Sequence, residues 1–192
     1  MRRCIREPSA SAAFEKGLPM ERAWLFGSLG VTVAAVDFLD PELRSQPDAR
    51  ERGVRVEIRP ISMQTGETVY ASPHISLQPA ICRIDLLESR PGAADRMHWH
   101  PAMRSGEPGD RTFDGALSAD PIGWVGERLR DLDRLVGGTY VAGAAGLGAD
   151  VTAVARVADE VVDAVCAGLE CSRAPWPDVA RDERGMAIAV DG

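Results

Sequence analysis

The hydrophobic and polar residues of this chain follow a two-residue period in its first half. Over residues 54–59, Val54, Val56 and Ile58 alternate strictly with charged side chains. This alternation is typical of an antiparallel strand with one buried face and one polar face. Further strand-like segments occur at 31–38, 67–71, 75–77, 80–87 and 96–100. We therefore expect an antiparallel β-sheet over residues 22–101, either open or closed into a barrel.

Beyond residue 118 the apolar residues recur at helical spacing instead. Asp120 can cap a helix that has Pro121 in its first position, and the apolar residues that follow are Ile122, Val125, Leu129, Leu132 and Val136. Asp150 can cap a second helix, whose apolar stripe comprises Val151, Val154, Ala158, Val161, Val162, Val165 and Leu169. We expect helices at 120–137 and 150–170 to cover the sheet, which makes an α+β fold.

These patterns predict one α+β domain over residues 21–172, with the sheet at 22–101 and the helical part at 118–171. Residues 1–20 mix charged, small and proline residues without a period, so we expect a flexible N-terminal arm there. Residues 173–192 are expected to form a C-terminal tail. Because no apolar segment reaches membrane-spanning length and no secretory signal is visible, we expect a cytoplasmic protein.

Composition narrows the classes of partner. The chain is 45% hydrophobic and 27% charged, which is ordinary for a globular protein. Its formal net charge of −7 argues against nucleic acids and anionic membranes as partners. Two kinds of partner remain compatible with this composition, namely a small polar molecule and a second copy of the chain in a homodimer.

The three histidines of the chain lie between positions 74 and 100, and two of them form the sequence His98-Trp99-His100. On a strand, side chains two positions apart point the same way, so one strand can offer two nitrogen ligands to one metal ion. Two arrangements are compatible with this alternation. Either the histidines face a pocket while Met97 and Trp99 pack behind, or Met97 and Trp99 face the main core and the histidines face solvent. Acid–base chemistry without a metal is a further alternative.

A metal bound by His98 and His100 needs a third ligand from elsewhere. His74, on a preceding strand, could complete a three-histidine site. A carboxylate from Glu107, Asp110 or Asp114 could do so instead. Two histidines and one carboxylate suit Fe, Mn or Zn with open coordination positions.

The segment 104–114 is rich in charge and carries a Pro-Gly turn. Arg111 could bind the carboxylate of a substrate, and Asp114 could contact the substrate or orient an imidazole. Alternatively, the segment is a solvated loop whose charges pair with one another. No catalytic residue can be assigned from the sequence.

The spacing of Gly92, His98 and His100, with five residues and then one between them, resembles the first half of the first cupin motif. A cupin motif continues with a glutamate three or four residues later, and a histidine from a second motif closes the metal site. Here the next glutamate is Glu107 and no histidine follows His100. The resemblance implies metal binding by the two histidines and covers only the strand, turn and strand around them.

A broader resemblance extends over most of residues 53–136. It is carried by Val69–Pro73, Asp85–Ser89, His98–Pro101 and Glu107–Arg111, and it is to an uncharacterised family of small proteins from high-GC bacteria. It implies no activity. The sequence thus indicates a metal-binding domain, either a metal-dependent enzyme acting on a small polar substrate or a non-catalytic small-molecule or protein-binding domain with structural histidines.

Overall fold

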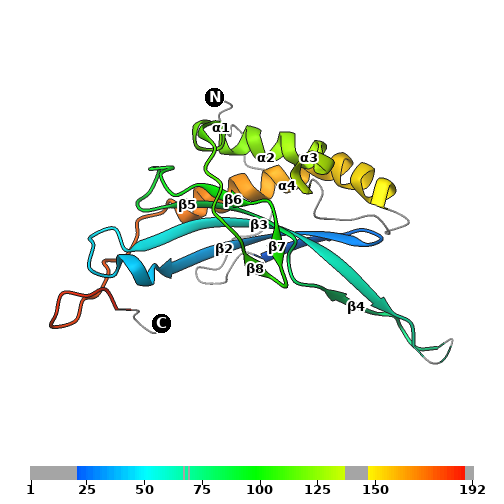
Figure 1. Ribbon diagram of the computed structural model, residues 1–192, viewed down its shortest axis with the longest axis horizontal. Coiled ribbons are helices and arrows are strands. Elements are labelled where there is room, and N and C mark those ends of the chain that lie inside the picture. Colours follow the sequence, from blue (N-terminus) through cyan, green and yellow to red (C-terminus); the bar gives the residue numbers. More distant parts are fainter. Residues whose placement is uncertain (1–20, 67, 69, 137–146, 189–192) are drawn as a thin grey trace, which may run out of the picture.

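The protein has two layers, an antiparallel sheet and a set of helices that lie together on one side of it (Figure 1). The computed structural model describes residues 21–66, 68, 70–136 and 147–188. The expected arm at 1–20 lies outside these residues. The prediction of an α+β fold with an antiparallel sheet and covering helices is confirmed.

The main sheet has the strand order β1-β2-β3-β5-β6, with β4 paired to β3 outside that path. The strands are β1 (Glu21–Leu25), β2 (Leu29–Leu39), β3 (Arg50–Gln64), β4 (His74–Leu77), β5 (Cys82–Glu88) and β6 (His98–His100). Two short strands, β7 (Met103–Arg104) and β8 (Glu107–Pro108), form a separate hairpin, and a 3-10 turn η1 (Pro41–Leu43) follows β2. Because β1 and β6 are not paired with each other, the sheet is open and does not close into a barrel.

The long strand β3 organises the sheet, because different parts of it pair with different strands. Residues 50–60 pair with β2, residues 52–58 also pair with β5, and residues 61–64 pair with β4. The strand expected at 67–71 is not formed by its described residues, since Thr68, Tyr70 and Ala71 lie in a turn. The reason is that β3 continues to Gln64 and β4 begins at His74, so this segment connects two paired strands.

Four helices follow the sheet in the described part of the chain: α1 (Gly115–Ala119), α2 (Pro121–Arg130), α3 (Leu132–Val136) and α4 (Leu147–Ser172). Asp120 caps α2 as expected, because its carboxylate accepts a hydrogen bond from the backbone N–H of Gly123. Asp150 does not cap α4, which begins three residues earlier. Its carboxylate instead accepts hydrogen bonds from the backbone N–H groups of Gly27 and Ser28, at 2.9 and 2.6 Å, and so ties α4 to the β1–β2 turn. Among the helices described, none combines the length and hydrophobicity needed to cross a bilayer.

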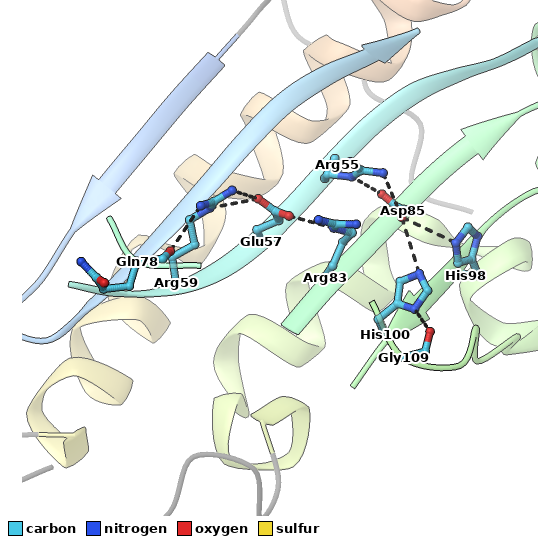
Figure 2. A network of polar contacts seen from close by, with 9 residues as sticks. All are labelled: Arg55, Glu57, Arg59, Gln78, Arg83, Asp85, His98, His100 and Gly109. Carbon is cyan, nitrogen blue, oxygen red and sulfur yellow. Dashed lines mark hydrogen bonds and ion pairs between the residues drawn. The ribbon is translucent and has the colours of Figure 1, made fainter. Parts of the chain in front are cut away.

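The hydrophobic core lies between the sheet and the helices. Alternate residues of β3, namely Val54, Val56 and Ile58, are buried there together with apolar residues of β2, β5, α2 and α4. The residues between them, including Arg55 and Glu57, therefore point to the opposite face. That second face carries charged side chains of the sheet (Figure 2), and the four described helices lie on the other side (Figure 1).

Candidate metal centre

Two histidines and one aspartate meet on the face of the sheet opposite the helices. His98 lies directly opposite Asp85 in the pairing of β5 with β6, and His100 lies two residues further along the same strand. All three side chains are buried, with exposed fractions of 2% for Asp85, 3% for His98 and 4% for His100. One ligand-type atom from each residue lies within 4.8 Å of the others. Figure 2 shows the two imidazoles turned toward the carboxylate, and we call this group the Asp-His-His triad.

Backbone carbonyl groups fix which ring nitrogen of each histidine carries hydrogen. His98 Nδ1 lies 2.8 Å from the carbonyl oxygen of Arg96, and His100 Nδ1 lies 2.9 Å from that of Gly109. A carbonyl oxygen only accepts hydrogen bonds, so Nδ1 must be the donor in both rings. In the neutral imidazole, Nε2 then keeps a lone pair. This is the tautomer in which histidine commonly binds a metal ion through Nε2.

Both Nε2 atoms face the same carboxylate oxygen. Asp85 Oδ2 lies 3.5 Å from His98 Nε2 and 3.8 Å from His100 Nε2. Two ligand atoms that are each about 2.1 Å from one ion are separated by about 3.0–3.4 Å, so small movements would bring all three to a single cation. Without a cation or added protons, two lone pairs and an anionic oxygen would repel one another.

The environment of His98 favours its neutral form. Burial is the largest effect and lowers the pKa of His98 below its ordinary value. The carbonyl of Arg96 and the charge of Asp85 oppose that effect, while the charges of Arg111 and His100 add to it. A neutral imidazole with a free Nε2 is the form that a metal ion requires.

Arg55 holds the carboxylate of the triad from the side of β3. Its Nε donates to Asp85 Oδ1 at 2.6 Å, and its Nη2 donates to Oδ2 at 3.3 Å. The contact is part-buried, and it fixes the plane of the carboxylate. Oδ1 is thereby committed to the arginine, and Oδ2 is the oxygen that faces the imidazoles.

A second ionic cluster lies one cross-strand row away, around Glu57. This carboxylate accepts hydrogen bonds from Arg59 and from Arg83, and Arg59 also donates to the carbonyl of Gln78 (Figure 2). Burial by itself would raise the pKa of Glu57, but the hydrogen bonds from Arg83 and Arg59 outweigh it and hold the pKa below its ordinary value. Arg83 is also the cross-strand neighbour of His100, so this cluster adjoins the triad.

The structure brings His98 and His100 together, but it places His74 and Glu107 elsewhere. His74 is exposed on β4, opposite Gln64 at the far end of β3, and its Nδ1 lies 3.2 Å from Ser76 Oγ. Glu107 is exposed on β8. Neither belongs to the ligand-type group found among the described residues, in which Asp85 is the third member.

The two residues expected to bind substrate lie in different surroundings. Asp114 caps α1 through the backbone N–H of Ala116 at 2.8 Å, and it accepts a hydrogen bond from Trp124 Nε1 at 2.9 Å. Both of its carboxylate oxygens thus have structural partners. Arg111 is exposed, and its charge acts on His98 and on Glu51.

The two arrangements considered for the histidine strand each describe part of the outcome. Met97 and Trp99 lie on the helix side, where Met97 joins the core and the Trp99 ring lies 5.5 Å from that of Trp124, centroid to centroid. The histidines occupy the opposite face of the sheet, yet they are buried and do not face solvent. Sequence reasoning missed Asp85, whose only signal is a charged residue in the otherwise apolar part of segment 80–87.

Glu51 is a buried carboxylate near the triad that lacks a hydrogen-bond partner. It is 1% exposed, and the nearest ion-pair nitrogen, Nη1 of Arg96, lies 3.9 Å from it. Burial is the main cause that raises the pKa of Glu51, while Arg111 and Arg96 act in the opposite direction. An unpartnered buried carboxylate is costly for stability, so its presence here needs a reason.

Comparison with known proteins does not assign this site. The chain matches no protein-family model, no curated protein and no solved structure. The site itself offers two imidazole nitrogens and one carboxylate oxygen on a buried patch of the sheet.

Proposed function

We propose that Asp85, His98 and His100 bind one divalent metal ion, and that the protein is a metal-dependent enzyme acting on a small polar molecule. The observation that carries this proposal is the fixed tautomer of the two histidines. Each donates Nδ1–H to a backbone carbonyl and thereby presents a free Nε2 to the oxygen of Asp85.

The donor set favours a transition metal. Two imidazole nitrogens and one carboxylate oxygen suit Fe, Mn or Zn, whereas calcium and magnesium prefer oxygen ligands throughout. A structural zinc site has four protein ligands, and the triad supplies three. Three protein ligands leave positions for water or substrate, so a bound ion could polarise a substrate oxygen or activate water or dioxygen.

The surrounding residues have supporting roles in this proposal. Arg55 keeps the Asp85 carboxylate in one orientation, and the carbonyl groups of Arg96 and Gly109 keep the two imidazole rings in theirs. Such partners typically change metal affinity by about 10- to 100-fold when removed. The ligand atoms are therefore positioned before any ion arrives.

Metal binding can be tested with the purified full chain. After treatment with a chelator, the protein would be titrated with Zn²⁺ and Co²⁺ by calorimetry, and the cobalt complex would be examined by absorption spectroscopy. We expect one ion per chain. The variant Asp85→Asn and the double variant His98→Ala, His100→Ala should lose that binding while their circular dichroism stays native.

His74→Ala is the matched control, because it removes the other histidine of the chain from an exposed position on β4. It should bind the ion as the wild type does. Failure of the wild type to bind either metal, or equal binding by the double variant, would contradict the proposal. A bound ion with no spectral response to added small ligands would point to a structural role instead.

A further inference from the structure

Thr112 pairs with β6 through an isolated bridge to Trp99. Trp99 and Thr112 exchange both backbone hydrogen bonds, with N···O distances of 3.0 and 2.8 Å, and they form an antiparallel bridge. Directly paired residues carry their side chains on the same face of a sheet, and their chain neighbours point to the other face. Because Trp99 packs on the helix side, Arg111 and Phe113 lie on the side of the triad.

The same register gives each of these residues a specific neighbour. With Trp99 opposite Thr112, Phe113 is opposite His98 and Arg111 is opposite His100. The aromatic contact agrees with this, since the ring centroids of Phe113 and His98 lie 5.7 Å apart. The triad is thus flanked by one cation and one aromatic ring.

Unlike the arginines that pair with carboxylates on this face, Arg111 has no ion-pair partner within the described residues. The partnered arginines are Arg55 with Asp85, Arg59 and Arg83 with Glu57, and Arg96 with Asp48. A guanidinium group presents a planar set of donors that matches the two oxygens of a carboxylate or a phosphate. An unpaired guanidinium beside buried ligand-type residues is therefore suited to an anionic group of a bound molecule.

Phe113 sets a second requirement for the molecule that binds beside the triad. Its side chain is 66% exposed although its ring contacts a buried histidine. An exposed aromatic ring at the rim of a polar site offers a surface to an apolar or planar group.

We infer that the substrate of this site is a small organic oxyanion, whose carboxylate or phosphate group binds Arg111 and whose apolar or planar body contacts Phe113. This inference rests on the proposed metal site, because it assigns the substrate class of the same face. Carboxylate and phosphate share the chemistry that a guanidinium recognises, and experiment can separate them.

The test uses four probe molecules on the zinc-loaded full chain. Benzoate and phenyl phosphate carry a ring and an oxyanion, acetate lacks the ring, and benzamide lacks the charge. Dissociation constants would be measured by calorimetry for the wild type, Arg111→Gln and Phe113→Ala. Arg104→Gln is the control, since Arg104 is an exposed arginine of the neighbouring hairpin.

We expect benzoate or phenyl phosphate to bind the wild type, and the tighter of the two identifies the oxyanion. Arg111→Gln should weaken that binding about tenfold, as expected for a hydrogen-bonded charge, while the chain still binds one zinc ion. Phe113→Ala should weaken benzoate more than acetate, and Arg104→Gln should have no effect. Equal binding by Arg111→Gln, equal binding of benzamide, or no oxyanion binding by the wild type would overturn the inference.

Failure of the metal proposal gives a different result. If zinc does not bind, the same titrations on the metal-free chain decide the inference separately. Oxyanion binding that depends on Arg111 would then support the proposed anion site, and only the metal proposal would be rejected. No such binding would overturn the inference as well.

Discussion

Arg55 and Asp85 lie directly opposite each other on β3 and β5, with Arg55 Nε 2.6 Å from Asp85 Oδ1. Oδ1 accepts the shorter hydrogen bond from the guanidinium, whereas Oδ2, which is 3.3 Å from Arg55 Nη2, also faces the two imidazoles. A long side chain on the central strand of the sheet therefore sets the orientation of a group on its neighbour. The geometry of the triad thus depends on β3 as well as on β5 and β6.

Replacing Arg55 should weaken metal binding without removing a ligand. In Arg55→Met, Asp85 would be a buried carboxylate without its cation, and its plane would no longer be fixed. We expect the affinity for zinc to fall about tenfold, as is typical for the partner of a metal ligand. We also expect the metal-free protein to lose about 3 kcal/mol of unfolding free energy. Calorimetric titration and urea denaturation measure the two effects.

Arg59→Met is the comparison for Arg55→Met, since Arg59 lies on the same face of β3 but binds Glu57. Its zinc affinity should match that of the wild type. If both variants lose zinc affinity to the same extent, the effect comes from general loosening of the strand and not from the Asp85 contact.

Glu57 should make the free energy of unfolding depend on pH in the acidic range. Its pKa in the folded protein is lowered, because the hydrogen bonds from Arg83 and Arg59 outweigh burial. A lowered folded pKa means that the stabilisation is fully present above the unfolded value of about 4.3, and is lost as the pH falls through the folded pKa. Glu57→Gln should therefore cost about 1–3 kcal/mol near neutral pH, and the difference from the wild type should shrink below about pH 4.

Urea denaturation of both proteins at several pH values measures that difference. Arg83 and Arg59 stay charged over the whole range, so the titration of Glu57 is the change that the comparison isolates. A difference between wild type and Glu57→Gln that stays constant from neutral to acidic pH would contradict the assigned role.

The fold could be predicted from sequence where burial on one face leaves a local pattern. The strict alternation at 54–59 lies within β3, and the helical spacing after Pro121 continues through α2 and α3. Local chemistry also located the start of α2, because an aspartate before a proline satisfies the first free N–H groups of a helix. Each of these signals depends only on residues close together in the chain.

The third member of the triad could not be predicted in the same way. Asp85 reaches the histidines because β5 and β6 pair in one specific register, and a shift by one residue would turn it to the helix side. His74 was expected near the histidine strand on the assumption that successive strands are neighbours. Instead β4 pairs with the far end of β3, because β3 is long enough to bind two strands one after the other.

Asp114 should prove to be a structural residue. Its carboxylate caps α1 and accepts the indole N–H of Trp124, so Asp114→Ala would free both donors. We expect its melting temperature to fall by a few degrees, at about the size of a lost helix cap, while zinc and benzoate affinities stay at wild-type values. Differential scanning calorimetry and the ligand titrations test this directly. A loss of benzoate binding at unchanged melting temperature would instead assign Asp114 to the substrate site, as its position in the sequence first suggested.

Gly53 should be required for the contact between β3 and β5 that carries the site. A Cβ atom added there would lie 2.0 Å from the carbonyl oxygen of Leu86, so the two strands would have to separate. Gly53 is two residues from Arg55, and separation would move Arg55 away from Asp85. We expect Gly53→Ala to lose more than about 2 kcal/mol of unfolding free energy and to bind zinc more weakly than the wild type.

Gly148→Ala is the control for Gly53→Ala, since a Cβ added at Gly148 in α4 meets nothing within 4 Å. Alanine forms helix better than glycine, so this variant should be unchanged or stabilised by up to about 1 kcal/mol. Urea denaturation and zinc titration of the two variants then separate the cost of crowding β3 against β5 from the general effect of adding a methyl group. Wild-type stability in Gly53→Ala would mean that the strands can part without loss, and the dependence of the triad on β3 would have to be abandoned.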